Sequence, residues 1–251
     1  MKYNLSASTI KAFDQHETNK YCGKRFKAVK IDKTHEELTG DAARLGQYFE
    51  SIVNGLKNRP ADTTQKGELT APYKKAVQAA EKTRERIVNI FGDSPTTFDV
   101  NLEKDGNKAI FDILIPDKHI IIDLKYSGLL GNKWEEFGWH PSTIGNSSHM
   151  TQAKFYIWFY YQIYGVIPSF FYYVQSSTDS DNFQVFSIKA DEAFVNSYNP
   201  YYYREMIDYK LSTNGFVAEP VYDQCLHCPL NNECKEKAVF PTTITVDLCS
   251  N

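Results

Sequence analysis

Three ionisable residues stand in two neighbouring apolar segments near the middle of the chain. Asp112 lies within "KAIFDILI", and Asp123 and Lys125 lie within "HIIIDLKYS". Residues two apart in a strand point to the same face, so Asp123 and Lys125 are expected to share one face. Charges among apolar neighbours need a partner or a metal ion. Two adjacent carboxylates suit Mg²⁺ or Mn²⁺, which polarises a phosphate and acidifies a bound water. The alternative is a buried Asp–Lys ion pair beside a hydrogen-bonded aspartate.

Other polar residues could serve the same chemistry. The ammonium of Lys125 could orient or deprotonate water, or stabilise charge on phosphorus. Glu50 in "LGQYFES" borders an apolar helical stripe and is a candidate third ligand, although such a residue is also common on surfaces. Gln152 and Tyr156 in "QAKFY" share one helix face, where they could reach a phosphate or a base, or pack in the core.

A second cluster is "CLHCPLNNEC", which holds Cys225, Cys228 and Cys234. A tetrahedral metal site takes four ligands, and zinc is the generic occupant of such a segment. His227, Cys249 or Cys22 could be the fourth, and His227 is disfavoured because it sits between two ligands. The chain has five cysteines, and its start, "MKYNLSASTI", holds no apolar signal region. Metal ligands or free thiols are therefore expected rather than disulfides.

The elements that must position these residues follow from periodicity. Apolar residues at helical spacing predict helices at 5–16, 40–56, 73–91, 149–164 and near 191–212, with Ser6 or Ser8 as the first N-cap. Alternating or apolar runs predict strands at 97–104, 108–115, 119–127, 169–176 and 183–189, with a hairpin turn at "DGN". The pattern indicates an α/β or α+β fold in which helices flank a small mixed sheet. The long loop 127–148 carries Trp134 and Trp139, which either stack bases or pack on the surface.

Composition and charge limit the possible functions. The 251 residues suit one large domain, and a net charge of −3 shows no global bias towards nucleic acid. The basic segment Lys20 to Lys33 could contact a DNA backbone or be an ordinary solvated surface. The most apolar stretch, 155–167, is shorter than the roughly 20 residues of a membrane span. A soluble, cytoplasmic protein without membrane contact is expected, and no GxxxxGK[ST] phosphate loop is present.

Together these motifs resemble the PD-(D/E)XK nuclease superfamily, in particular the RecB/AddB-like branch that includes CRISPR-associated and phage-encoded exonucleases. "GQYFE" resembles the Gly-x-x-x-His/Glu helix, "FDILIPDKHIIIDLKYS" the Asp…Asp/Glu-x-Lys hairpin, and "QAKFY" the Gln-x-x-x-Tyr motif, in family order. Phe111 stands where the motif's name has Pro, and Glu50 where many members have His. The resemblance implies a restriction-endonuclease-like α/β core. The roles it implies are divalent-metal ligands Glu50, Asp112 and Asp123, catalytic Lys125, and substrate-side Gln152 and Tyr156.

The same branch has iron–sulfur members with one cysteine before the core and three after it. Those three are spaced Cys-x2-Cys-x5-Cys with Pro after the second, where Pro229 stands. This resemblance implies a [4Fe–4S] cluster, with Zn²⁺ as the alternative, held by Cys22, Cys225, Cys228 and Cys234. It also implies one nuclease domain over 1–251 with a core at about 41–190. A cluster-binding subdomain of 1–30 plus 215–240 would join the two chain ends.

The expected function is a divalent-metal-dependent DNA exonuclease that hydrolyses phosphodiester bonds in single strands or at duplex ends. The resemblance implies work in DNA recombination, repair, phage DNA processing or CRISPR adaptation, in a bacterial, archaeal or phage-infected host cytoplasm. A recombination or CRISPR-adaptation protein would be a partner. The alternative is a non-catalytic nucleic-acid-binding protein with a structural zinc or iron–sulfur site.

Overall fold

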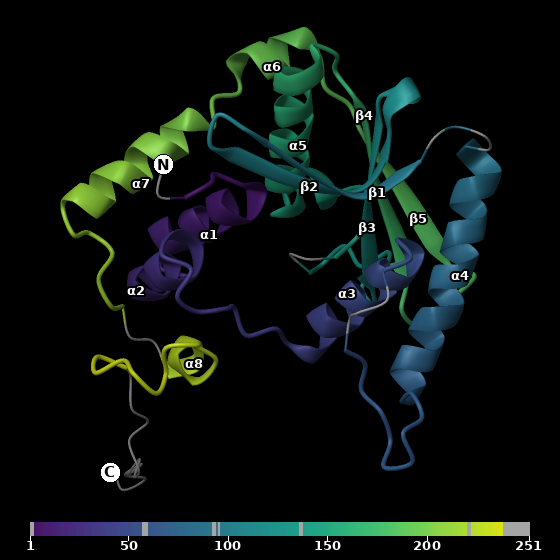
Figure 1. Cartoon of the computed structure of the whole chain (residues 1–251), viewed down its shortest axis with the longest axis horizontal. Helices are drawn as coiled ribbons and strands as arrows, with labels where there is room; N and C mark the ends of the chain where they lie inside the picture. Colours follow the sequence, from purple (N-terminus) through teal and green to yellow (C-terminus); the bar gives the residue numbers. More distant parts are fainter. Residues whose placement is uncertain are drawn as a thin grey trace, which may run out of the picture. The chain divides into compact units, whose positions relative to one another are not determined.

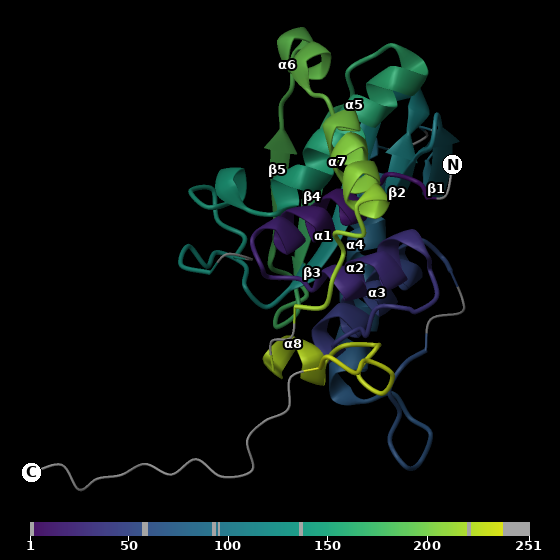
Figure 2. The same ribbon diagram turned by 90° about the vertical axis from the view of Figure 1, so that its left-hand side faces the viewer.

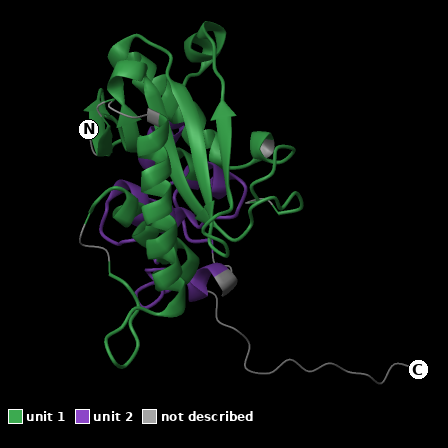
Figure 3. Ribbon diagram, turned by 90° about the vertical axis from the view of Figure 1, so that its right-hand side faces the viewer, with its two compact units in different colours: residues 1, 3–11, 39–202 green, residues 2, 12–38, 203–251 purple. Residues whose placement is uncertain are grey.

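The computed structural model describes residues 3–56, 60–91, 94, 96–135, 138–219 and 222–237. Their contacts define two compact units (Figure 3). Unit 1 is formed by residues 3–11 and 39–202, and unit 2 by residues 12–38 and the described residues from 203 onward. Unit 2 therefore combines two segments that the whole of 39–202 separates in sequence.

Unit 1 is built around a five-stranded sheet in the order β1-β2-β3-β4-β5 (Figure 1). The strands are β1 (Thr97–Lys104), β2 (Asn107–Ile115), β3 (Ile120–Ser127), β4 (Ser169–Ser176) and β5 (Phe183–Ile188). Neighbouring strands are antiparallel except β3 and β4, which are parallel. Helix α5 (His149–Tyr164) joins β3 to β4, because a parallel pair needs a crossover connection. The predicted small mixed sheet flanked by helices is confirmed.

The β1–β2 hairpin turns at Asp105 and Gly106. Lys104 pairs with Asn107, so the loop has two residues, and their φ angles are 50° and 72°. Positive φ at both central positions is the requirement of a type I′ turn, whose twist matches that of the strands. Glycine takes this conformation without a steric penalty. The turn predicted from "DGN" is confirmed.

Helices α3 (Asp41–Val53) and α4 (Ala71–Phe91) pack against the sheet. Three small residues of α4, Ala76, Ala79 and Ala80, are almost completely buried and allow this helix to lie close to the strands. The cluster that they join is Phe49, Val53, Ala76, Ala79, Ala80, Ile87, Ile113, Ile115, Ile122, Leu124 and Tyr173. Because side chains alternate along a strand, Asp123, between Ile122 and Leu124, points to the opposite face, which carries α5.

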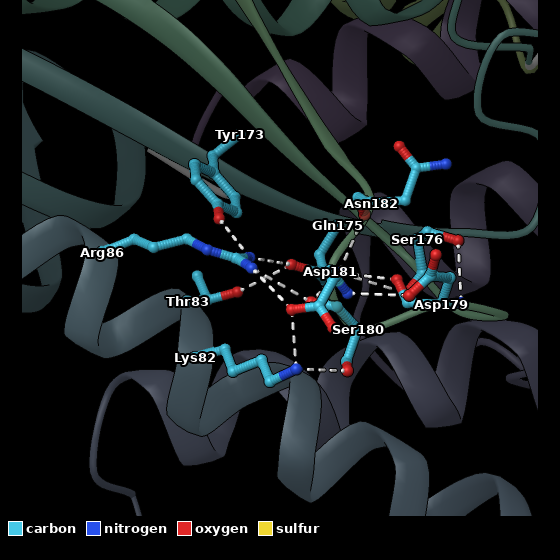
Figure 4. A network of polar contacts seen from close by, with 10 residues as sticks. All are labelled: Lys82, Thr83, Arg86, Tyr173, Gln175, Ser176, Asp179, Ser180, Asp181 and Asn182. Carbon is cyan, nitrogen blue, oxygen red and sulfur yellow. Dashed lines mark hydrogen bonds and ion pairs between the residues drawn. The ribbon is translucent and has the colours of Figure 1, made fainter.

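Gln175 ties the β4–β5 turn to α4 (Figure 4). Its side chain is fully buried, and its Nε2 donates to the carbonyls of Asn182 at 2.9 Å and Ser180 at 3.2 Å. Its Oε1 accepts from Thr83 at 3.2 Å and from Arg86 at 3.1 Å. A buried amide with all its partners present rigidifies the surrounding structure. This network holds the end of the strand that neighbours β3.

The remaining helices include one correction. They are α1 (Ala7–Glu17), α2 (Gly23–Phe26), the π-helical turn η1 (Lys27–Ile31), α6 (Glu192–Ser197), α7 (Tyr201–Ser212) and α8 (Tyr222–Leu226). The prediction of one helix near 191–212 is wrong, because this stretch forms α6 and α7, which are separate in Figure 2. Pro200 disfavours helical backbone in the residue before it, and the side chain of that residue, Asn199, accepts from the N–H of Tyr201 at 3.1 Å. Ser6 caps α1, as predicted, by accepting from the N–H of Thr9.

Candidate active site and cysteine pocket

The β2–β3 hairpin brings Asp112 close to Asp123. The strand pairing ends at Ile113 and Ile122, and Asp112 and Asp123 are the next residues of the two strands beyond that pair. Besides burial, the charge of Asp123 raises the pKa of Asp112, which places the two carboxylates near each other. Asp112 is 8% exposed and Asp123 is 0% exposed. Asp112 Oδ2 accepts from the N–H of Leu124 at 2.7 Å. The hairpin therefore brings two carboxylates side by side in a buried position.

Lys125 and Gln152 hold Asp123 from two sides. Lys125 Nζ forms an ion pair with Oδ2 of Asp123, as expected for two residues on one face of a strand. Gln152, on α5, donates from Nε2 to Oδ1 of Asp123 at 2.5 Å. The Lys125 ammonium also lies 5.6 Å from the ring centroid of Tyr172. Both oxygens of Asp123 are thus engaged, and the carboxylate has a fixed orientation.

Glu50, half-buried on α3, adds a third negative charge. Burial raises the pKa of Asp112 well above its usual value, and the charges of Asp123 and Glu50 raise it further. Burial also raises the pKa of Asp123, against the opposing effect of Lys125. Burial by itself lowers the pKa of Lys125, but the carboxylates of Asp123, Asp112 and Glu50 raise it above the usual value. Three carboxylates therefore share one ammonium in a poorly solvated site.

Two tyrosines border these carboxylates. Tyr156, on α5, is 8% exposed, and burial followed by the charges of Asp123 and Asp112 raises the pKa of its phenol. The pKa of Tyr172 is raised by burial and by Asp123, and its hydroxyl donates to the carbonyl of His149 at 2.5 Å. Both phenols therefore remain hydrogen-bond donors. No sequence motif singled out Tyr172, because its place follows from the parallel pairing that sets it beside Asp123.

The charges of this site fit a divalent cation. Within the described part of the chain, no three His, Cys, Asp or Glu side chains are gathered closely enough to hold one ion. The donor set nevertheless suits Mg²⁺ or Mn²⁺, since both ions prefer carboxylate oxygens. Three carboxylates around one ammonium leave an excess of negative charge, which adds to the effect of burial in raising the pKa of Asp112. A cation with two positive charges would relieve that excess.

The cysteine pocket lies within unit 2 and is lined by all four predicted cysteines. Cys22, Cys225, Cys228 and Cys234 contribute to it together with Lys24, Arg25 and Leu230. All four are free thiols of intermediate exposure. Burial raises the pKa of Cys228, against the effect of Arg25, and the nearby Cys22 and Cys225 raise it further. The structure thus places Cys22 on one pocket with the three C-terminal cysteines, although no three of these described thiols are gathered closely enough to hold one ion. Thiols are the ligands that iron–sulfur clusters and zinc take.

The sequence offered two other candidate ligands, His227 and Cys249. His227 is exposed and is absent from the described residues that line the pocket. Cys249 lies outside the described residues. The short helix α8 and the turn after it bring the other three cysteines to the same pocket. The N–H of Cys228 donates to the carbonyl of Cys225 at 3.2 Å, and the N–H of Cys234 donates to the carbonyl of Leu230 at 2.8 Å.

The basic segment Lys20 to Lys33 carries several acidic partners. Lys24 pairs with Glu236 at 2.8 Å and Lys27 with Asp32 at 2.6 Å. Arg25 pairs with Glu37. Each pair removes positive charge that a DNA backbone would need, so these contacts favour the interpretation of an ordinary surface.

The two tryptophans of the loop before α5 have opposite environments. Trp139 is 2% exposed and stacks on His149 with ring centroids 4.1 Å apart. Its N–H donates to the carbonyl of Leu129 at 3.1 Å, which closes the loop at its base. Trp134 is 84% exposed, with Lys133 Nζ 4.7 Å from its ring centroid. Trp139 therefore packs, whereas the ring of Trp134 is open to solvent.

Comparisons with known proteins support the fold. No family model matches the sequence, and no curated protein matches it. The structure is similar to the crystal structure of a protein from Eubacterium rectale named as a candidate exonuclease, with a TM-score of 0.60, 21% identity, and coverage of 95% of this chain and 91% of that one. A weaker likeness, to the crystal structure of SSO0001, has a TM-score of 0.32 and 14% identity over 66% of this chain and 77% of that one, and carries no argument. The first likeness shows a shared fold.

The described helices include none that combines the length and apolar character needed to cross a bilayer.

Proposed function

We propose that this chain is a divalent-metal-dependent nuclease that hydrolyses phosphodiester bonds in DNA. The observation that carries the proposal is the pair of buried, neighbouring carboxylates, Asp112 and Asp123, with Lys125 in ion-pair contact with one of them. A fold shared with a protein named as a candidate exonuclease adds support. A structural ion pair needs only one of the two aspartates, whereas a metal site uses both.

Asp112, Asp123 and Glu50 would hold Mg²⁺ or Mn²⁺. When bound, the ion supplies Lewis-acid activation of a phosphate oxygen and a more acidic water. Gln152 keeps one oxygen of Asp123 in a fixed position through its 2.5 Å hydrogen bond. Besides burial, the charges of Asp123 and Asp112 help to raise the pKa of the nearby Tyr156 phenol. This phenol would donate a hydrogen bond to the substrate.

Lys125 would act on the phosphate as a hydrogen-bond donor. The raised pKa of Lys125 favours a protonated ammonium, which stabilises charge, over a neutral amine, which would act as a base. In the reaction, a water oxygen forms a bond to phosphorus while the ester P–O bond breaks. The water loses a proton, and the leaving alkoxide gains one, so that an alcohol and a phosphate monoester result.

The four thiols of the cysteine pocket would hold a [4Fe–4S] cluster, with zinc as the alternative occupant. The cluster would join two segments of unit 2 that are far apart in sequence, and the role we propose for it is structural. The pathways to which such a nuclease would belong are DNA recombination, repair, phage DNA processing and CRISPR adaptation. The substrates would be single strands or duplex ends.

Degradation of end-labelled DNA tests the proposal. Anaerobically purified protein is mixed with single- or double-stranded substrate in Mg²⁺, Mn²⁺ or EDTA. We expect cleavage with either metal and none in EDTA. Asp112→Ala and Lys125→Ala should each lower the rate by about 100-fold or more, as when a group that stabilises the transition state is removed.

Two exposed residues, Asp117 and Lys189, provide matched controls, and their alanine variants should cleave at the wild-type rate. Cleavage that survives Asp112→Ala or Lys125→Ala would refute the assigned site. Metal-independent DNA binding without any cleavage would support the non-catalytic alternative. Iron and sulfide analysis of the same preparation, with absorbance near 400 nm, separates an iron–sulfur cluster from zinc.

A further inference from the structure

Within unit 2, residues 217–219 lie against residues 22–24. Lys24 N–H donates to the carbonyl of Val217 at 3.0 Å. A Cβ at Gly23 would lie 2.9 Å from the Val217 carbonyl oxygen and 3.0 Å from Cε1 of His16. Real Cβ atoms essentially never come so close to another heavy atom, so only glycine allows this approach. The residue directly before it is Cys22, a member of the cysteine pocket.

Glu219 contacts Cys22 and two residues near it, Gly23 and His16. Its Oε2 accepts from the N–H of Gly23 at 3.0 Å. The same oxygen lies 3.1 Å from Nδ1 of His16. Its own N–H points to the sulfur of Cys22 at 3.4 Å. One residue therefore fixes the backbone beside Cys22 through its carboxylate and the thiol itself through its amide.

His16 is a rigid support for Glu219. Its side chain is 3% exposed, and its ring centroid lies 5.3 Å from that of Phe216. Lys210 Nζ lies 3.0 Å from Nε2 of His16, and Lys210 also pairs with Glu17 at 2.6 Å. An ammonium can only donate, so Nε2 accepts and the ring proton lies on Nδ1. That nitrogen lies 3.1 Å from Oε2 of Glu219 and 3.2 Å from the carbonyl oxygen of Tyr21.

We propose that Glu219, supported by His16, is the positioning residue that holds Cys22 in the cysteine pocket. The inference rests on the proposed cysteine site, but it concerns the protein before any metal is loaded. An N–H directed at a cysteine sulfur also suits a cluster ligand, because hydrogen bonds to the sulfurs influence cluster potentials. Glu219 would therefore prepare Cys22 for ligation and would touch no substrate.

Alkylation of the metal-free, reduced protein tests the positioning role. Iodoacetamide is the probe, and mass spectrometry follows the rate at each cysteine separately. In Glu219→Ala, Cys22 should react about ten-fold faster than in the wild type, because hydrogen bonds to a charged acceptor are lost. Cys225, Cys228 and Cys234 should change far less. Glu36→Ala, which removes an exposed carboxylate of the same unit, is the control and should leave all four rates unchanged.

A second variant guards against a general loss of structure. Glu219→Gln keeps the size of the side chain and an acceptor for Gly23, so Cys22 should react faster than in the wild type but slower than in Glu219→Ala. Equal Cys22 rates in Glu219→Gln, Glu36→Ala and the wild type would overturn the proposal, as would an equal rise at all four cysteines in Glu219→Gln. Reconstitution with iron and sulfide is a separate measurement. A wild-type protein that takes up no cluster would refute the cofactor assignment, while the alkylation rates would still decide the role of Glu219.

Discussion

The neighbouring carboxylates predict that Asp112→Asn stabilises the fold while it abolishes activity. Asn has the shape of Asp, and its Oδ1 can still accept from the N–H of Leu124, which donates to Asp112 at 2.7 Å. Two charges about 5 Å apart, at an effective dielectric constant near 20, repel each other by about 3 kcal/mol. The ion pair of Lys125 with Asp123 offsets part of this repulsion. We therefore expect the variant to be more stable by about 1–2 kcal/mol at alkaline pH without metal, which is within the range that single stabilising substitutions commonly give.

The pH dependence has a definite sign. The pKa of Asp112 is raised in the folded state, so the folded protein binds the proton more tightly than the unfolded chain does. The stabilisation from protonated Asp112 is complete below its ordinary pKa of 3.8 and is lost as the pH rises through the raised folded value. The advantage of Asp112→Asn should therefore be small near pH 4 and should grow towards pH 8.5.

Urea denaturation in EDTA at several pH values measures this difference. In thermal unfolding it should appear as a rise in Tm of about 2–8 °C for a chain of this size. Mg²⁺ or Mn²⁺ should stabilise the wild type more than the variant, because ligand binding to the folded state alone adds stability. Asp117→Asn, at an exposed position on the same hairpin, should change neither quantity. A variant no more stable than the wild type at pH 8.5 in EDTA would refute the argument from charge repulsion.

Three further predictions concern single side chains. Gln152→Ala should lower kcat by about ten-fold with little change in KM, because a side chain that positions a catalytic group is lost. Gln162→Ala on the same helix is the control. An unchanged kcat in Gln152→Ala would count against the proposed role of Gln152. Trp134→Ala should raise KM for single-stranded DNA by about ten-fold, as the loss of one base-stacking contact would, without changing stability; an unchanged KM would exclude stacking. Gln175→Leu should destabilise the fold by about 2–4 kcal/mol in urea denaturation, because it leaves buried partners unsatisfied, and a loss below 1 kcal/mol would contradict the importance of that network.

The strands and most helices could be predicted because their signals are local. Alternation of polar and apolar residues located β1, and the Asp-Gly pair located its turn. The break between α6 and α7 also has a local signal, Pro200, which the periodicity of the surrounding residues outweighed. Local patterns decide the backbone wherever propensity and packing agree.

The geometry of the candidate site depended on contacts that no local pattern contains. The proximity of Asp112 to Asp123 depends on the pairing of β2 with β3. Tyr172 reaches the site because β4 runs parallel to β3, and this pairing depends on the crossover through α5. Glu219 belongs to no motif, and its contacts with Cys22 and Gly23 appear only when distant segments meet.

The composition of unit 2 has a consequence for synthesis of the protein. Cys22 precedes Cys225 by 203 residues, which is 225 minus 22. At roughly 5–20 residues per second, a ribosome needs about 10–40 s to travel that distance. All strands of unit 1 are translated during this interval, while the thiol of Cys22 and the N–H groups of Gly23 and Lys24 await partners that have not been made. The pocket with all four cysteines can therefore form only after every strand of the sheet has been translated.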